Sequence, residues 1–217
     1  GTPVVVLSSQ DVYAQFGRLN GLDAPPPEAL ITEESPLTQP FPYRGLEGHD
    51  HIHDYCKQQL EQAFREAVAD GRLPGATVLR LGAVYGRRDP HRRLGFLLDA
   101  LDRGARLPSG DGPGLRWTHV HVDDVAHAVA LAAEASPSGF RVFNIGEAET
   151  PSFRERGEQL AALAGRRARW DPEAALEGEW EFLGPVPNDV VVDSSRVRSE
   201  LGFHETRVRD AVLTDTI

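Results

Sequence analysis

Short apolar runs alternate with longer amphipathic stretches along this chain. The run at residues 4–9 is rich in β-branched side chains and ends in two serines, which is typical of a buried parallel strand that delivers polar groups to a site. Between residues 54 and 70, apolar positions recur at helical spacing, and Gly71 and Pro74 end the pattern. A second apolar run, at residues 76–81, then completes a strand, helix, strand sequence.

The same alternation continues to the end of the chain. Four further helices are predicted, over residues 93–101, 123–135 and 152–164 and from a cap at Asp193 or Ser194 to Gly202. Three further strands are predicted, over residues 117–122, 140–145 and 189–192, with a turn over 109–114. The proline-rich stretch at 21–48 has no period, so we expect a long surface loop there. Strands that alternate with helices predict a parallel α/β sheet.

The charge balance narrows the classes of partner. The chain has 23 Lys+Arg against 33 Asp+Glu, a net charge of −10, and no basic run longer than two residues. Nucleic-acid binding needs a basic surface, so we expect none. No apolar run approaches the roughly 18–20 residues that cross a bilayer, and no secretory signal stands at the start, so we expect a cytoplasmic protein without membrane contact. Small molecules are therefore the expected partners.

Few residues offer redox or metal chemistry. The single cysteine, Cys56, forms neither an internal disulfide nor a zinc site with a second thiol. His49, His51 and His53 alternate with carboxylates, and an extended backbone would place the three imidazoles on one face. In a loop rich in proline and glycine a solvated histidine cluster is commoner, so we expect no bound metal.

Five segments, in order, carry a family resemblance. They are Ser-Ser-Gln-Asp-Val-Tyr at 8–13, Thr-Glu-Glu-Ser-Pro-Leu at 32–37, Leu-Arg-Leu-Gly-Ala-Val-Tyr-Gly at 79–86, Gly-Asp-Gly through His-Val-Asp-Asp-Val-Ala at 110–126, and Phe-Asn-Ile-Gly at 143–146. Together they resemble the extended short-chain dehydrogenases/reductases, the NAD-dependent sugar-nucleotide epimerases and dehydratases. Each segment alone is weak, whereas five in the right order are specific.

The resemblance implies a fold and its division. We expect a Rossmann-like parallel sheet flanked by helices, formed by residues 1–86 and 118–150, and a small C-terminal α+β substrate lobe formed by 87–117 and 151–217. Such proteins begin with a strand, a glycine-rich turn and a helix that hold the dinucleotide pyrophosphate. That portion is missing here. The only glycine-rich candidate, Gly110, Gly112 and Gly114, precedes a strand and does not join a strand to a helix, so it predicts only a turn. The chain therefore reads as a piece of a longer protein that alone binds its cofactor poorly.

The implied catalytic pair is a Tyr-x-x-x-Lys motif, and this chain departs from it. Lys57, followed four residues later by Glu61, matches the family lysine, but four residues before it stands His53. Tyr55 lies two residues before Lys57, which on a continuous helix is nearly the opposite side. Three alternatives follow: Tyr55 precedes the helix and turns into the site, His53 acts as the base, or catalysis is lost.

Three neighbouring residues bear on the reaction type. The resemblance gives Ser9 the role of the residue that hydrogen-bonds the reacting oxygen, although a strand-end serine also bonds its local backbone. Asp11 stands where dehydratases place a glutamate, and Gln10 stands where they place an aspartic acid. Because an amide cannot act as a carboxylic acid, dehydration is disfavoured, and epimerisation or ketone reduction is favoured.

The remaining implied contacts divide between cofactor and substrate. The resemblance places Ser8, Lys57, Leu81, Gly82, Ala83 and Val84 beside NAD, with NADP as the alternative. It places Tyr85, Arg92 and Arg116 beside the substrate, with Arg116 on the nucleotide diphosphate. A tight strand exit at 82–84 and a solvated Arg116 are the simpler interpretations.

The implied reaction is transient oxidation of a sugar hydroxyl by NAD, followed by epimerisation and reduction of the keto intermediate. One alternative is a non-catalytic Rossmann-like binding domain, and another is an NAD(P)-dependent reductase of a small carbonyl compound. The test is whether Lys57 and a proton-transferring side chain converge on Ser9. The resemblance also implies a homodimer, formed through the helix over 54–70.

Overall fold

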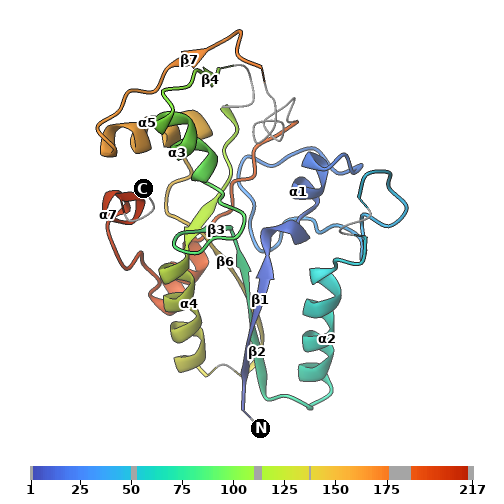
Figure 1. The fold of residues 1–217 in the computed structure, drawn as a ribbon. Helices are drawn as coiled ribbons and strands as arrows, with labels where there is room; N and C mark the ends of the chain where they lie inside the picture. Colours follow the sequence, from blue (N-terminus) through green and yellow to red (C-terminus); the bar gives the residue numbers. More distant parts are fainter. Residues whose placement is uncertain (1, 50–52, 110–113, 137, 176–186, 215–217) are drawn as a thin grey trace.

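The computed structural model describes residues 2–49, 53–109, 114–136, 138–175 and 187–214. Its centre is a parallel three-stranded sheet in the order β1-β2-β6, formed by Val4–Ser9, Gly75–Leu81 and Gly139–Ile145 (Figure 1). Val4 pairs with Ala76, and Gly75 pairs with Gly139, so all three strands end at the same edge. These strands match the predicted runs at 4–9, 76–81 and 140–145.

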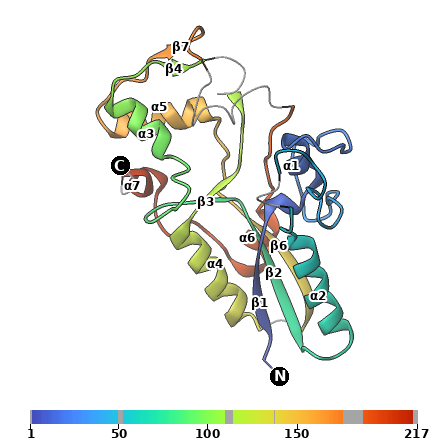
Figure 2. The ribbon, with the colours of Figure 1, turned by 45° about the vertical axis from the view of Figure 1, so that its right-hand side comes forward.

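Helices cover both faces of this sheet. Helix α2 (Lys57–Ala69) packs on β1, β2 and β6, and helix α4 (Val122–Glu134) lies on the opposite side (Figures 1 and 2). Helix α6 (Ser195–Leu201) packs against β6 and ends at Gly202, whose φ of 70° is the left-handed conformation that glycine adopts freely. The Rossmann-like parallel sheet that the sequence predicts is confirmed.

A second layer of short elements lies beyond the carboxyl edge of the sheet. Helices α3 (Gly95–Asp102) and α5 (Phe153–Leu163) pack together beneath the strand pair β4 (Leu107–Pro108) and β7 (Trp170–Asp171) (Figure 1). Ser152 and Glu155 form a capping box at the start of α5. The division of the chain into a core and a substrate lobe at the residues given above stays a prediction.

The elements between these two layers position the site. The 3-10 helix η1 (Gln10–Val12) and helix α1 (Ala14–Leu19) follow β1 directly. The parallel pair β3 (Ala83–Tyr85) and β5 (His119–His121) leads from the sheet toward the upper layer. Helix α7 (Arg209–Thr214) contacts α5.

Several sequence-based boundaries were wrong. Helices α1 and α7 and strands β3, β4 and β7 were not predicted, because elements of two to six residues carry too little period to recognise. Helix α2 begins at Lys57 and not at 54, since Cys56 is extended (φ −150°, ψ 91°) and caps it. Residues 189–192 form isolated bridges and not a strand: Val190 pairs with Trp117, and Val192 pairs with Ile31.

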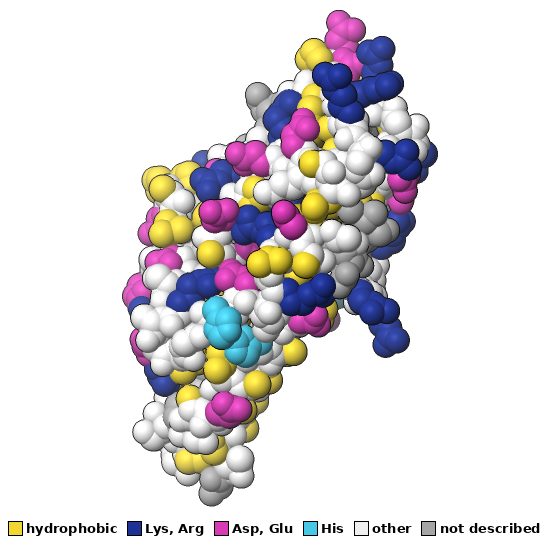
Figure 3. Space-filling view, turned by 90° about the vertical axis from the view of Figure 1, so that its left-hand side faces the viewer, with side chains coloured by type: hydrophobic (Ala, Val, Ile, Leu, Met, Phe, Trp, Pro, Cys, Tyr) yellow, Lys and Arg dark blue, Asp and Glu magenta, His cyan; other side chains and the backbone are white. Residues whose placement is uncertain are grey.

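Two further observations concern the surface and the outlying segments. On the face shown in Figure 3, Lys and Arg side chains are interspersed with Asp and Glu and form no broad patch of one sign. No helix in the described part of the chain is long and apolar enough to cross a membrane. Residues 110–113 of the predicted glycine-rich turn lie outside the described residues.

Candidate active site

A group of four side chains, which we call the Ser9 cluster, meets at the carboxyl end of β1: Ser9, Asp11, Tyr55 and Lys57. Ser9 is the last residue of β1, and its Oγ accepts a hydrogen bond from the backbone N–H of Asp11 at 3.3 Å. Because η1 turns immediately after the strand, the Asp11 carboxylate stays close enough to Ser9 for the Ser9 hydroxyl to lower its pKa.

Tyr55 reaches this group because it precedes α2. Its hydroxyl donates a hydrogen bond to Asp11 Oδ2 at 3.1 Å. The ammonium of Lys57, the first residue of α2, lies 5.8 Å from the centre of the Tyr55 ring. The helix start at residue 57 therefore removes the conflict that a continuous helix would create between Tyr55 and Lys57.

Within the Ser9 cluster, Tyr55 and Asp11 have different roles in hydrogen bonding. Burial raises the pKa of Asp11, against the opposing effects of hydrogen bonds from Ser9 and Tyr55 and of the charges of Arg93 and Lys57. Burial of its hydroxyl end, followed by the negative charge of Asp11, raises the pKa of Tyr55. Tyr55 is thus protonated at neutral pH, and Asp11 is the group that accepts its hydrogen bond.

Lys57 is the only lysine among the 217 residues, and every other basic side chain except histidine is arginine. In the described part of the chain, no ion pair engages its half-buried ammonium. An ammonium is a compact charge that can lose a proton, whereas a guanidinium cannot. Sequence reasoning overlooked this exclusive use of lysine, although it was readable from composition.

The other sequence-based proton carrier lies differently. His53 is about half exposed, and its Nε2 lies 3.1 Å from Asp54 Oδ2. Asp54 also pairs with Arg44 at 2.7 Å. His53 thus belongs to an exposed charged loop, whereas Tyr55 is bonded within the Ser9 cluster.

A second group, the Glu61 cluster, lies directly beneath and consists of Ser8, Tyr13, Glu61, Arg80 and Asn144. Arg80 donates to both oxygens of Glu61, at 3.0 and 2.7 Å, and Ser8 Oγ donates to Glu61 Oε1 at 2.6 Å. Tyr13 donates to Asn144 Oδ1 at 2.6 Å and accepts from Arg80 at 3.0 Å. Ser8, one of the implied cofactor contacts, is 4% exposed, and its hydroxyl is bonded to Glu61 inside the protein.

The other implied cofactor contacts lie in a closed seam. Ala83 N–H donates to Thr118 O at 2.8 Å, and a Cβ on Gly82 would come within 2.8 Å of the same oxygen. Gly82 and Ala83 are buried, while Leu81 and Val84 are half-buried. Among the described residues, no glycine-rich turn joins a strand to a helix. Of the implied contacts in this segment, Leu81 and Val84 thus remain partly accessible, and a pyrophosphate cradle is not among the described residues.

An aromatic pocket is linked to the Ser9 cluster through Gln10 and Arg93. It has a volume of about 380 Å³ and is lined by His91, Arg92, Arg93, Phe96, Trp117, His119 and Phe153. Two observations link it to the Ser9 cluster: the charge of Arg93 acts on Asp11, and the Gln10 amide, turned to match donors with acceptors, accepts from the indole N–H of Trp117. Sequence reasoning missed Trp117 and His119, because their roles depend on contacts between distant segments.

The three implied substrate contacts are not brought together. Arg92 lines the aromatic pocket and pairs with both oxygens of Asp99, at 2.9 and 3.0 Å. Tyr85 is buried, and its hydroxyl donates to Glu147 at 2.6 Å. Arg116 is exposed, and its Nε donates to Thr150 O at 2.9 Å. Arg116 and Trp117 are successive residues of an extended segment, and they line different cavities.

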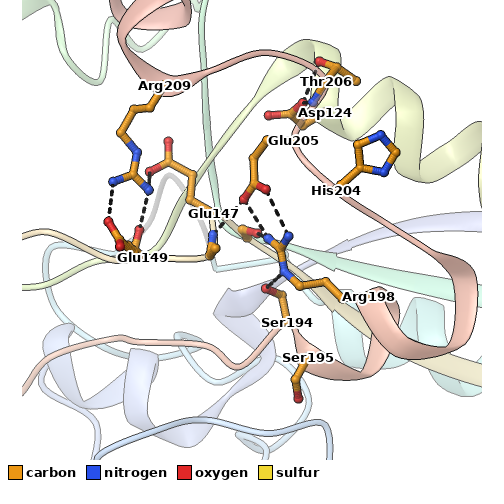
Figure 4. A network of polar contacts seen from close by, with 12 residues as sticks. Asp124, Glu147, Glu149, Ser194, Ser195, Arg198, His204, Glu205, Thr206 and Arg209 are labelled. Carbon is orange, nitrogen blue, oxygen red and sulfur yellow. Dashed lines mark hydrogen bonds and ion pairs between the residues drawn. The ribbon is translucent and has the colours of Figure 1, made fainter.

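The cavity beside Arg116 is an open cleft of about 1070 Å³ at the start of α5 and α6. Figure 4 shows that two of its arginines, Arg198 and Arg209, are paired with carboxylates of the protein. Arg198 binds Glu205 at 2.7 and 3.0 Å, and Arg209 binds Glu149 at 3.1 Å. Arg116 and Arg154, which also line the cleft, donate to the backbone oxygens of Thr150 and Ser109.

Among the described residues, no group of three or more His, Cys, Asp or Glu side chains is placed to hold a metal ion. His49 bonds Glu47 O at 2.9 Å and stacks on Tyr43. His51 lies outside the described residues.

Comparison with known families decides the relationship. The family model described as "NAD dependent epimerase/dehydratase family" matches residues 2–146, two thirds of the chain. The chain belongs to this family. No curated protein sequence matches it.

Solved structures similar to this family member include epimerases and dehydratases. UDP-glucose 4-epimerase of Thermotoga maritima, solved with UDP-glucose, has a TM-score of 0.68 at 19% identity, over 99% of this chain and 62% of that one. A dTDP-glucose 4,6-dehydratase of Streptomyces venezuelae, solved with NAD, has a TM-score of 0.66 at 21% identity, over 99% and 58%. MoeE5, solved with UDP-glucuronic acid and NAD, has a TM-score of 0.66 at 26% identity, over 99% and 63%. The chain thus spans about three fifths of these proteins.

Proposed function

We propose that this chain performs the proton-transfer chemistry of an NAD-dependent epimerase acting on a nucleotide-sugar through a transient keto intermediate. The observation that carries the proposal is the convergence of Ser9, Asp11, Tyr55 and Lys57 at the carboxyl edge of the sheet. This is the edge at which ligands bind in open α/β sheets. The nucleotide-sugars bound by the similar solved proteins support the substrate class.

The residues divide the proton transfer among them. Ser9 holds the reacting oxygen, which fixes the substrate hydroxyl beside Tyr55. The substrate proton passes to the Tyr55 oxygen as Tyr55 passes its own proton to Asp11, and the reverse sequence returns a proton to the new alcohol. Lys57 stabilises the negative charge that develops on the tyrosine oxygen during transfer. NAD, when bound, supplies the group that takes up hydride and returns it.

The described residues would contact the dinucleotide only at its nicotinamide end. Lys57 would face the nicotinamide ribose, and the half-buried side chains Leu81 and Val84 would lie beside the ring. Gln10 lacks an acidic proton, so loss of water from the substrate has no obvious donor at this position. Epimerisation is therefore favoured over dehydration.

One observation favours a second candidate, an NAD(P)-dependent reductase of a small carbonyl compound. Arg116, the implied diphosphate ligand, lines the open cleft beside Thr150 and not the aromatic pocket. A small carbonyl substrate would not need that arginine. Tyr55, protonated at neutral pH, is suited to donate a proton to a carbonyl oxygen.

The experiment is a conversion assay of the purified protein with NAD and either UDP-glucose or dTDP-glucose, followed by chromatography of the sugars. Tyr55→Phe and Lys57→Met should each lower conversion at least about 100-fold. Ser136→Ala, in an exposed turn, is the control and should convert at the wild-type rate. Turnover of a small ketone with NAD(P)H, and none of the sugars, would replace the proposal with the second candidate.

A second readout does not depend on turnover. Reductive ¹³C-methylation labels Lys57 and the N-terminal amine, since the chain has no other lysine. The Lys57 signal should shift when UDP-glucose is added to the wild type, and more weakly in Tyr55→Phe. A signal unmoved by every nucleotide-sugar, together with no conversion, would overturn the catalytic proposal.

A further inference from the structure

We infer that His119 selects the base of the nucleotide substrate, by accepting a hydrogen bond from an imide N–H of the uracil or thymine type in the aromatic pocket. This inference rests on the proposed nucleotide-sugar function and names the residue that sets its specificity. It begins from a pocket-lining imidazole whose second ring nitrogen forms no hydrogen bond among the described residues.

The tautomer of His119 is fixed by its backbone contact. His119 Nδ1 lies 2.7 Å from Trp117 O, and a carbonyl oxygen can only accept, so the ring proton is on Nδ1. Nε2 then carries the lone pair. The side chain is 6% exposed and lines the pocket, and within the described residues Nε2 has no hydrogen bond.

The imidazole also stays neutral. Burial, and then the charge of Arg156, lowers the pKa of His119 to about 4, while Glu147 and the bond to Trp117 O act in the opposite direction. Arg93 adds a further positive charge nearby. At neutral pH the pocket therefore presents an acceptor and not a cation.

Rigid neighbours hold the ring in place from behind. Tyr85 meets it edge to face at a centroid distance of 6.1 Å, and Tyr85 is held by Glu147, which Arg156 binds at 2.5 Å. A preorganised acceptor discriminates better than a mobile one, because it cannot turn away from a mismatched ligand.

The aromatic walls of the pocket favour a planar ligand. Phe153 and Trp117 lie 5.8 and 6.0 Å from the His119 ring, and Phe96 lies 6.0 Å from Phe153. Aromatic surfaces of this kind stack on a nucleobase. Arg92 and Arg93 line the same pocket, and each is paired with a carboxylate, Arg92 with Asp99 and Arg93 with Asp89.

Pyrimidine bases differ in whether they offer a hydrogen-bond donor to the Nε2 of His119. Uracil and thymine carry an N–H at position 3, whereas cytosine presents a lone pair there. A neutral Nε2 acceptor can accept a hydrogen bond from the N3–H of uracil or thymine. Opposite cytosine, two lone pairs would face each other, and both acceptors would be buried without a hydrogen bond. A preference for UDP over CDP should result.

The test is calorimetric titration of the purified protein with UDP and with CDP, neither of which requires turnover. We expect wild type to bind UDP at least 10-fold more tightly. His119→Phe keeps the aromatic packing and should lower UDP affinity about 10-fold while leaving CDP unchanged. His119→Gln can present either amide group, so it should bind both nucleotides with similar affinity. His127→Gln, on helix α4 and not among the residues that line the pocket, is the control and should keep the preference.

The pH dependence separates recognition from packing. The preference for UDP should be constant from pH 5.5 to 8 and decline toward pH 4, as His119 gains a proton. Equal binding of UDP and CDP, binding of neither, or a preference that His119→Phe leaves intact would overturn the inference. Selective UDP binding without sugar conversion would leave it standing and count against the proposed function alone.

Discussion

The Ser9 cluster and the Glu61 cluster are built from the same segments, yet they differ in nearly every physical respect. In the Glu61 cluster each polar group is buried and bonded, with Ser8, Arg80 and Asn144 at 4% exposure or less. In the Ser9 cluster Tyr55 is 38% exposed, and the Lys57 ammonium has no ion pair among the described residues.

The difference arises from the geometry of one strand and one helix. Successive side chains of β1 point to opposite sides, so Ser8 enters the interior as Ser9 reaches the site. On α2, Glu61 lies one turn deeper than Lys57, which begins the helix at the edge of the sheet. One cluster thus anchors the strand and helix, and the other remains available for a substrate.

Breaking the Glu61 cluster should have the largest effect on stability. Glu61→Ala leaves Arg80 buried without its carboxylate, so we expect a loss of about 3–5 kcal/mol in the free energy of unfolding. Urea denaturation measures it. Glu66→Ala, on the exposed side of the same helix, should stay within about 0.5 kcal/mol of wild type. A loss below about 1 kcal/mol for Glu61→Ala would show that the cluster does not anchor the fold.

The two neighbouring serines should separate stability from catalysis. Ser9→Ala should lower turnover about 100-fold, because the reacting oxygen loses a donor, with a stability loss under about 1 kcal/mol. Ser8→Ala removes a buried donor from Glu61 and should cost about 1–2 kcal/mol, with the smaller effect on turnover. Steady-state kinetics and urea denaturation of both variants check this. Equal effects of the two substitutions on both quantities would contradict the division into two clusters.

The smallest expected effect is that of Asp11 on how the free energy of unfolding depends on pH. Because burial raises its pKa in the folded protein, the folded state holds this proton more tightly than the unfolded state does. Its contribution to stability therefore falls as pH rises from the unfolded pKa of the carboxyl through the raised folded pKa. Asp11→Asn should remove this decline and be more stable than wild type at pH 7. Chemical denaturation at pH 4 and pH 7 measures it, and a less stable variant at pH 7 would refute the assignment.

The sheet was predictable because its strands are continuous apolar runs, and the motif residues at strand ends follow from them. Ser9 and Lys57 could be placed near one edge from sequence alone. The role of Tyr55 could not, since it depends on whether the helix begins at 54 or at 57, and periodicity does not fix a helix start. In the structure Cys56 is extended, so the helix begins at Lys57 and Tyr55 precedes it.

The pocket side of the site was beyond sequence reasoning for a different reason. His119 lies in a short buried strand, and the orientation of its ring follows from contacts with residues 85, 117 and 153. Arg116 attracted attention as an arginine in a motif, but the direction of its side chain is set by bridges to Ser152 and by its neighbour Trp117 to Val190. Both are matters of tertiary pairing.

The hydrogen bond between Tyr13 and Asn144 joins residues 131 positions apart. During synthesis the chain emerges from its N-terminus, so Tyr13 and Arg80 are exposed to solvent long before Asn144 is made. Parallel pairing of β2 with β6 also joins distant segments, Gly75 with Gly139, and such non-local contacts slow folding. The network that makes the native sheet rigid is thus among the last parts to assemble, and until then its buried charges must stay hydrated.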